Sequence, residues 1–365
     1  MRVARAARVI AAVVLCSLLT LLGVAPGAGL RAGKATQTYP TPQAAAFLAT
    51  YVRADGRVAR PDQGNDTVSE GQAYGLLIAQ TMGNERLFRR IWQWTRRHLQ
   101  RDDGLFAWRA GANGQVWGWA PASDADVLIA WALLRYRGAG AEGLHTEGRR
   151  VAEAVLSQEV TTTSDGLPVL TAGPWATGRP ATLDPSYWSL PAFTELARLT
   201  GDRTWRRLAD SAVVLTGRLT RGGRRLPPDW ATLGDSGQLL PSTAPDYSQP
   251  QPRYGLDAQR TVVWFAASCD PRAVALARQW WQLLDRPSRP AAMALQLDGR
   301  VLNPTPAVLP LVAAAAAAHA ADAPVNSALL LRRAADQDRR HPGYYGSAWN
   351  AFGPALLDSR VLSGC

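Results

Sequence analysis

The stretch Val68-Ser69-Glu70-Gly71-Gln72-Ala73-Tyr74-Gly75-Leu76 places one carboxyl group among glycines, an aromatic ring and aliphatic side chains. Ser69 is suited to cap a helix, and the apolar residues from Tyr74 onward predict that a buried helix follows. Glu70 then lies in the first turn of that helix, where a carboxylate is electrostatically favoured. An ordinary first-turn glutamate is one interpretation, and an acid sheltered from water is the other.

Three later segments repeat this arrangement of a polar or acidic start followed by an apolar helix. In one of them Asp184 can cap a helix, and Pro185 suits the first helical position. Four predicted helices therefore open with polar or acidic groups. The three segments are Ala122-Ser123-Asp124-Ala125-Asp126, Asp184-Pro185-Ser186-Tyr187-Trp188 and Tyr254-Gly255-Leu256-Asp257-Ala258-Gln259-Arg260.

Hydrophobic periodicity and stop signals predict about twelve helices, whereas strand-like runs are short and few. Prolines that follow a capping residue support four of the helix starts, at Pro42, Pro185, Pro271 and Pro304. Twelve helices in antiparallel pairs can close as an all-α fold, an (α/α)6 barrel of six inner and six outer helices. The expected ranges are 43–54, 70–82, 84–100, 124–138, 146–160, 185–200, 202–219, 256–268, 272–285, 304–322, 326–339 and 344–358.

The order of the helices predicts where the polar starts lie. Glu70, Asp124, Tyr187 and Asp257 begin the second, fourth, sixth and eighth predicted helices. Alternate helices of an antiparallel ring point the same way, so we expect these four residues to meet at one end of the barrel, in a cleft lined by carboxylates. The tenth helix carries a run of alanines from Ala313 and is apolar on nearly every side, which fits the inner layer.

The four segments together resemble glycoside hydrolase family 8, which holds bacterial endoglucanases, including those encoded with cellulose synthase, and also xylanases and chitosanases. Residues 69–76 are similar to the family's signature around its proton donor, and residues 122–126 are similar to its second signature. The resemblance extends from about Tyr51 to Leu357. It implies the same (α/α)6 barrel that the helix count predicts.

By this resemblance Glu70 is the general acid, Asp257 is the general base that activates water, and Asp124 holds the sugar at the cleavage point. Tyr187 and Arg260 match residues that flank the site. Inverting cleavage needs an acid and a base whose carboxyls are roughly 6.5 to 9.5 Å apart. Arg260 follows Asp257 by one turn, and it either keeps that carboxylate ionised or only stabilises its helix.

Glu70 can act as an acid near neutral pH only if its pKa is raised. Burial and the charge of Asp124 must then outweigh the helix N-terminus, which lowers the pKa. We expect Tyr74 and Tyr187 to supply the apolar shelter and to lie at the substrate. Asp126, in the same segment as Asp124, is also expected to contact the substrate.

Fourteen tryptophans are many for this chain. Trp117 and Trp119 lie in a glycine-rich loop just before Asp124, and an exposed tryptophan beside a cleft suits stacking against sugar rings. Simple packing is the alternative for both. Trp230 follows Pro227-Pro228-Asp229, in a loop that either lines the cleft or serves as a structural turn.

The N-terminus has the three-part layout of an export signal: arginines, an apolar run over 9–24 and small residues at 25–28. We therefore divide the chain into an export signal or N-terminal membrane anchor at 1–30, a linker at 31–40 and a catalytic domain at 41–365. The length of the apolar run leaves both cleavage and membrane contact open. The protein is expected to be extracytoplasmic, either secreted or associated with the cell envelope.

The formal net charge of +11 raises the question of an anionic partner. Lys34 is the only lysine, and Arg89, Arg90, Arg96 and Arg97 have the spacing of a solvated helix face. No nucleic-acid motif accompanies them, so we expect no nucleic-acid partner.

Two cysteines, Cys269 and Cys365, remain after removal of a signal. In an oxidising compartment they can form one disulfide, and two buried thiols are the alternative. The four histidines are scattered without metal-ligand spacing, so we expect neither a metal nor another cofactor.

Taken together, these features predict a monomeric, exported endo-β-1,4-glucanase that hydrolyses a β-1,4-linked polysaccharide with inversion. A xylanase or a chitosanase of the same family is the alternative among enzymes. A non-catalytic glycan-binding envelope protein, from another class, would keep the aromatic platforms but lose the acid or the base. Glu70 and Asp257 are both present, which favours an enzyme.

Overall fold

The computed structural model describes residues 38–246, 250–359 and 361–362. Within them the chain forms twelve α-helices, one for each predicted range, so the all-α fold class is confirmed. The helices are α1 (Pro42–Tyr51), α2 (Ser69–Thr81), α3 (Glu85–His98), α4 (Ser123–Arg135), α5 (Ala141–Gln158), α6 (Leu190–Thr200), α7 (Thr204–Leu219), α8 (Leu256–Ala266), α9 (Pro271–Leu284), α10 (Val308–Ala320), α11 (Pro324–Arg340) and α12 (Tyr344–Leu357).

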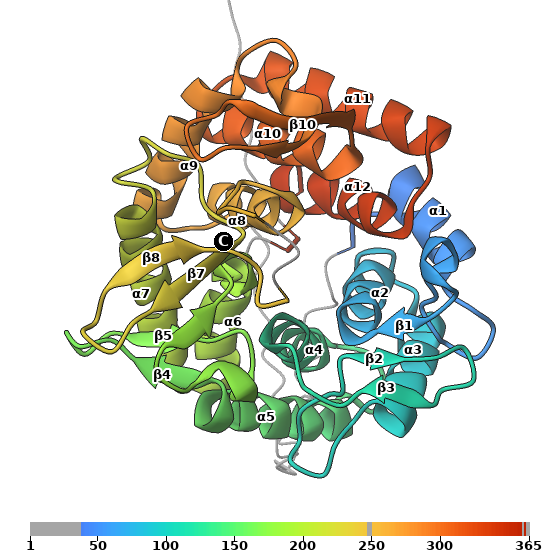
Figure 1. The fold of residues 1–365 in the computed structure, drawn as a ribbon. Helices are drawn as coiled ribbons and strands as arrows, with labels where there is room; N and C mark the ends of the chain where they lie inside the picture. Colours follow the sequence, from blue (N-terminus) through green and yellow to red (C-terminus); the bar gives the residue numbers. More distant parts are fainter. Residues whose placement is uncertain (1–37, 247–249, 360, 363–365) are drawn as a thin grey trace, which may run out of the picture. The chain divides into compact units, whose positions relative to one another are not determined.

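The helices form two concentric layers (Figure 1). The even-numbered helices pack against one another in sequence, and α12 contacts α2, so the inner ring is closed. Helix α4 is buried along its whole length, as an inner helix must be. Helix α3 buries one apolar stripe and leaves its arginines on the other side, as expected of the outer layer. The predicted (α/α)6 barrel is confirmed.

Small residues set how closely the inner helices approach. Helix α10 is buried through most of its length, because its alanines leave room for neighbours on every side. Gly71 of α2 faces α12: a Cβ atom at this position would lie 2.6 Å from the hydroxyl of Tyr344. Glycine is therefore required here, and its absent side chain lets Tyr344 reach the start of α2.

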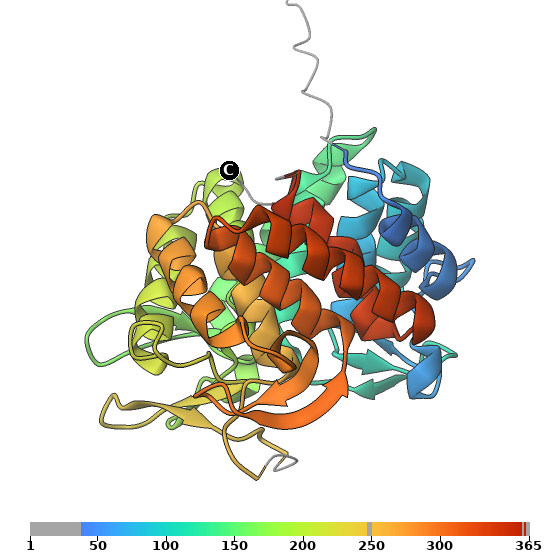
Figure 2. The same cartoon turned by 90° about the horizontal axis from the view of Figure 1, so that it is seen from above.

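The strands are short and form four antiparallel sheets of two or three strands. Figure 2 shows them gathered at one end of the barrel. Several lead directly into helix starts, so this end carries the first turns of inner helices. The sheets are β1 (Thr67–Val68), β2 (Arg109–Ala110) and β3 (Val116–Gly118); β4 (Val160–Thr162) and β5 (Pro168–Leu170); β6 (Ala181–Leu183), β7 (Trp230–Leu233) and β8 (Leu239–Ser242); and β9 (Ala292–Leu295) and β10 (Val301–Pro306).

Two predicted helix starts are wrong in detail. Ser69 is the first residue of α2 and not its cap: Val68 holds the N-cap position, and no side chain there bonds to the first turn. The backbone N–H of Ser69 pairs with the carbonyl of Trp108 at 3.0 Å. Pro304 lies in β10 and does not begin a helix, because the strand around Asn303 pairs with β9. Helix α10 begins only at Val308.

The sixth predicted helix is divided. Asp184 caps a single 3-10 turn, Pro185–Tyr187, and α6 begins later, at Leu190. Tyr187 therefore precedes the sixth helix instead of opening it. The predicted caps Thr41 and Asp270 are confirmed, since each side chain accepts a hydrogen bond from the first turn of its helix.

Residues 1–37 lie outside the described residues, so the export signal or anchor and most of the linker stay predictions. Of the helices that the structure describes, none is both long and apolar enough to cross a membrane.

Candidate active site

The side chain of Arg260 is buried at one end of the barrel and contacts four carboxyl groups. Its Nη1 donates to Oδ2 of Asp124 at 2.8 Å and to Oε2 of Glu70 at 3.1 Å. Its Nη2 donates to Oδ1 of Asp257 at 3.2 Å and lies 3.7 Å from Oδ2 of Asp184. One positive charge among four acids cannot compensate all of them, so some of the acids favour the neutral form.

Helix direction explains why these acids meet. Glu70, Asp124 and Asp257 lie in the first turns of α2, α4 and α8, which are all inner helices. Inner helices separated by one outer helix run in the same direction, so their first turns share one end of the barrel. The predicted convergence at one end is confirmed by the contacts that the three residues make with Arg260.

Glu70 is sheltered from water on most sides, and its side chain is 21% exposed. The hydroxyl of Tyr344, from the start of α12, donates to Oε1 at 3.3 Å. Burial raises the pKa of Glu70 to about 7, against the opposing attraction of Arg260. A carboxyl group with this pKa holds its proton in a large fraction of molecules at neutral pH, which suits a proton donor.

Asp257 is the most open acid of the cluster, with 35% of its side chain exposed. Glu70 and Asp257 bind different nitrogens of one guanidinium, so the nearer oxygens of the two carboxyl groups are separated by no more than roughly 9 Å. This limit lies below the upper end of the range for inverting glycosidases.

Asp124 is buried and also accepts from the N–H of Ala125 at 2.8 Å. Burial raises its pKa, although Arg260 opposes the shift.

Asp184 also belongs to the cluster, although the sequence indicated it only as a helix cap. Its Oδ1 makes that cap by accepting from the N–H of Ser186 at 2.8 Å, while Oδ2 faces Arg260. Burial, and then the charge of Asp257, raises the pKa of Asp184 well above its usual range. The sequence signal was incomplete because capping uses only one of the two carboxyl oxygens.

The two predicted tyrosines have different surroundings. Tyr74 is fully buried, and its hydroxyl accepts from Arg260 at 3.4 Å. The ring of Tyr74 lies edge-on against Trp349 and Phe352 inside the barrel. Its predicted contact with the substrate is therefore wrong. Tyr187 is half-buried, with its ring centroid 5.2 Å from the guanidinium carbon of Arg260. It covers the arginine, as an apolar shelter should.

The predicted contact of Asp126 with the substrate is also wrong. It lies two residues after Asp124, and such residues do not face the same side of a helix. Its side chain is fully buried, and Oδ1 accepts from the N–H of Phe106 at 2.9 Å. Substrate cannot reach it. Burial raises the pKa of Asp126 and of the buried Glu159 well above their usual ranges, and the charge of Asp126 raises that of Glu159 further.

The predicted aromatic platforms lie at two places. Trp117 and Trp119, on and just after β3, are 55% and 61% exposed. The guanidinium of Arg109 lies over the ring of Trp117 at 5.4 Å. Trp230 instead lines a cavity of about 660 Å³ that Asp257 also borders, so the loop before β7 does line the open side of the cluster. The other aromatic residues of this cavity are Trp108, Trp175 and Tyr345.

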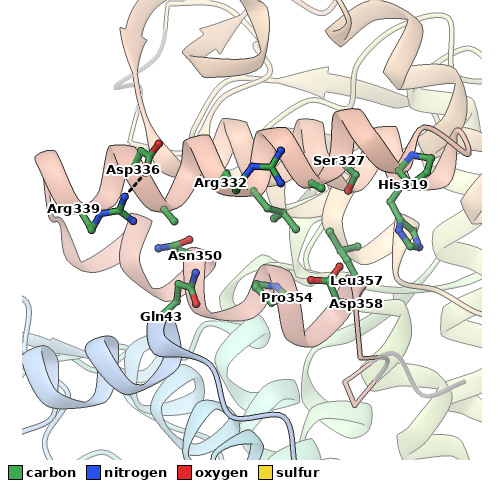
Figure 3. A pocket seen from close by; sticks show the side chains of 14 residues that line it. Gln43, His319, Ser327, Arg332, Asp336, Arg339, Asn350, Pro354, Leu357 and Asp358 are labelled. Atoms are coloured by element: carbon green, nitrogen blue, oxygen red, sulfur yellow. Dashed lines mark hydrogen bonds and ion pairs between the residues drawn. The ribbon is translucent and has the colours of Figure 1, made fainter.

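A second hollow, of about 770 Å³, lies between α11 and α12 (Figure 3). Its polar residues include Arg332, Arg339, Asp336 and Asn350. None of the four acids that contact Arg260 lines it, so we place the chemistry at the Arg260 cluster. Within the part of the chain that the structure describes, no group of three or more histidine, cysteine or acidic side chains is arranged to hold a metal ion.

Cys269 takes part in a disulfide bond. Its predicted partner, Cys365, lies outside the described residues, so that pairing stays a prediction.

Comparisons with known proteins identify the family of this chain. The family model for glycosyl hydrolases family 8 matches residues 30–288. An endoglucanase of Cellulomonas uda is 30% identical over 252 residues, which cover 67% of this chain and 68% of that protein. A probable endoglucanase of Novacetimonas hansenii is 31% identical over 262 residues, covering 66% of this chain and 73% of that one.

Solved structures are similar over nearly the whole chain. The structure of an endo-β-1,4-glucanase from Acetobacter xylinum has a TM-score of 0.71 and 25% identity, and the match covers 87% of this chain and 97% of that one. A family 8 endoglucanase from Klebsiella pneumoniae also has a TM-score of 0.71 and 25% identity, over 88% of this chain and 99% of that one.

Proposed function

This chain belongs to glycosyl hydrolases family 8 and is a glycoside hydrolase, and from this premise we propose that it is an endo-β-1,4-glucanase that inverts the anomeric centre. One observation carries the proposal: a sheltered acid and an open acid lie on separate nitrogens of one buried arginine. The sheltered acid, Glu70, has a pKa raised to about 7. The open acid, Asp257, borders a cavity large enough for sugar units.

In the proposed reaction Glu70 gives its proton to the oxygen of the glycosidic bond as that bond breaks. Asp257 takes a proton from a water molecule, and the water oxygen bonds to the anomeric carbon from the opposite face. Each cleavage therefore consumes one water, moves one proton from Glu70 and places one on Asp257. The two carboxyl groups then return to their starting states by proton exchange with solvent.

Arg260 supports both acids in this scheme. Its Nη2 donates a hydrogen bond to Oδ1 of Asp257, the carboxyl group that is proposed to take a proton from water. Its Nη1 contact stabilises the carboxylate that remains on Glu70 after proton transfer. Asp124, held by the same nitrogen, is the proposed contact for the sugar at the cleavage point.

The proposed substrate is a β-1,4-linked glucan, because the similar structure from Acetobacter xylinum is that of an endo-β-1,4-glucanase. Trp230 and Tyr187 have ring centroids 6.3 Å apart and offer apolar surface beside the acids. Trp117 and Trp119, on and just after β3, offer more exposed aromatic surface. Flat apolar rings of this kind suit the faces of sugar units.

Cleavage of soluble carboxymethyl-cellulose, xylan and chitosan tests the proposal, with release of reducing ends as the measure. Glucan cleavage that is lost in both Glu70→Gln and Asp257→Asn supports it. Proton NMR of a cello-oligosaccharide digest should show the α-anomer first, since inversion of a β-bond yields it. A first product with β configuration excludes inversion, and cleavage of xylan or chitosan alone changes the substrate.

We also propose that the protein is exported and acts as a monomer outside the cytoplasm. The arginines, apolar run and small residues at 1–28 support export. Fractionation of expressing cells, with N-terminal sequencing of the mature protein, tests export and cleavage together. Light scattering tests the monomer.

A further inference from the structure

Helix α8, which carries Asp257, has no capping side chain of its own. Its N-cap residue is Gly255, which has no side chain to accept a hydrogen bond. The cap comes from a distant loop instead: Oδ1 of Asp229 accepts from the N–H of Gly255 at 2.8 Å and from the N–H of Ala258 at 3.0 Å. These two N–H groups lie on either side of Asp257, so one carboxylate oxygen spans the segment that holds the proposed base.

A second set of contacts fixes Asp229 to the same segment. Its backbone N–H donates to the carbonyl of Arg253 at 2.8 Å, and its Oδ2 accepts from Nε of Arg253 at 3.1 Å. A Cβ atom at position 255 would lie 2.5 Å from Oδ2 of Asp229, so glycine is needed for this close approach. Asp229 is buried, and these contacts hold it against the start of α8.

The sheet beneath these residues joins both sides of the cluster. Asp229 immediately precedes β7, and β7 pairs with β6 so that Ala231 lies opposite Leu183. Asp184 follows β6 directly and faces Arg260 on the second turn of α8. One three-stranded sheet therefore places Asp229 at the start of α8 and Asp184 beside Arg260, one turn later in the same helix.

We propose that Asp229 is a positioning residue for the reaction, which acts through the first turn of α8 to aim the carboxylate of Asp257. This inference rests on the proposed function, because it takes Asp257 as the base. The base must hold water at a defined point beside the sugar, and a misplacement of about 1 Å can cost roughly 10²-fold in rate. A helix start that frays or shifts would produce such a misplacement.

The test compares three variants at the cap of α8 with one variant at the cap of another helix. Asp229→Ala removes the cap, Asp229→Asn keeps an acceptor oxygen, and Gly255→Ala displaces the carboxylate without changing charge. The control is Asp270→Ala, since Asp270 caps α9 and also pairs with an arginine, Arg272, away from the cluster. Asp257→Asn is measured beside them.

We expect Asp229→Ala to lower kcat roughly 10²-fold with a much smaller change in KM, because the aromatic side chains that line the cavity are kept while the carboxylate of Asp257 is displaced. Gly255→Ala should lower kcat in the same way, and Asp229→Asn should recover most of the rate. Asp270→Ala should lose a similar amount of thermal stability and keep wild-type kcat. Gly255→Ala provides the answer if Asp229→Ala does not fold.

Wild-type kcat in folded Asp229→Ala or in Gly255→Ala overturns the positioning role if Asp257→Asn is inactive. An equal loss of kcat in Asp270→Ala also overturns it, because the loss would then follow general destabilisation. Full activity of Asp257→Asn would instead overturn the proposed function itself, so the two failures are distinguishable.

Discussion

Arg260 follows Glu70 by 190 residues in the chain, yet its Nη1 lies 3.1 Å from Oε2 of Glu70. The same nitrogen reaches Asp124 at 2.8 Å. The arginine opposes the effect of burial on Glu70 but does not cancel it, so the acid keeps a raised pKa beside a cation. Burial keeps the proton on Glu70 until it is donated, and Arg260 stabilises the carboxylate that remains afterwards.

Glu70→Gln is expected to lower kcat by roughly 10²- to 10⁴-fold, because an amide cannot protonate the glycosidic oxygen. Reducing-end release from a soluble glucan measures the loss. The matched control is Glu142→Gln, an exposed first-turn glutamate of α5, which should keep wild-type activity. Near wild-type kcat in folded Glu70→Gln would remove this residue from the role of acid.

The raised pKa of Glu70 predicts that kcat/KM falls as the pH rises above about 7, since the proton to be donated is then lost. The same shift makes the folded state bind the proton more tightly than the unfolded chain. Its contribution to stability is therefore lost as pH rises from the unfolded value toward about 7. A pH–rate profile checks the first part, and kcat/KM that still increases above pH 8 would contradict it.

Arg260→Met should lower the free energy of unfolding by about 3–5 kcal/mol, because it leaves buried carboxyl groups without their cation. Arg260→Lys should be intermediate, since an ammonium cannot serve two carboxylates from two separate nitrogens. Urea unfolding at neutral pH measures both. The control is Arg339→Met, which breaks a surface ion pair with Asp336 and should cost less than about 1 kcal/mol. Equal losses at the two sites would show that the cluster does not depend on the arginine.

Glu159→Gln should make the protein more stable relative to wild type as the pH rises. Burial raises the pKa of Glu159, so wild type loses stability with increasing pH, by up to about 1.4 kcal/mol per pH unit for one proton. Glutamine carries no such proton and is nearly the same size. Melting temperatures of the two proteins at several pH values between 5 and 8 check this. A constant difference across that range would contradict it.

Trp117→Ala and Trp119→Ala should each raise KM for long glucans by roughly three- to tenfold with kcat unchanged, because loss of a stacking surface weakens binding only. Steady-state kinetics on long and short oligosaccharides measure this, and the effect should shrink for short ones. Leu329→Ala, an exposed apolar residue of α11, is the control. Reduced stability with unchanged KM would show that the tryptophans serve only in packing.

Much of the candidate site could be predicted from local sequence. A carboxyl group that follows a capping or extended residue and precedes an apolar run marks a first turn, and Glu70, Asp124 and Asp257 all lie in first turns. Asp126 shows where such reasoning went too far. Its spacing of two residues from Asp124 already indicated a different side of α4, and the structure buries it against Phe106.

Other parts of the site carry no local signal. The link from Asp229 to α8 spans 26 residues to Gly255, and nothing near either residue in the chain indicates the pairing. The contact of Asp184 Oδ2 with Arg260 also has no local signal, because helix capping by Oδ1 is already a sufficient reason for an aspartate at this position. The bond from Tyr344 to Glu70 joins the last helix to the second and depends on the absent side chain of Gly71.

The sequence by itself determined the helices, their alternation between inner and outer layers and the end at which the acids meet, because periodicity, caps and chain direction are local properties. The tertiary structure alone decided which acid is sheltered and which is open. Those differences arise from burial and from contacts among residues far apart in the chain, with Arg260 reaching Asp124 across 136 residues. Burial and distant charges shift a pKa only once the chain has folded.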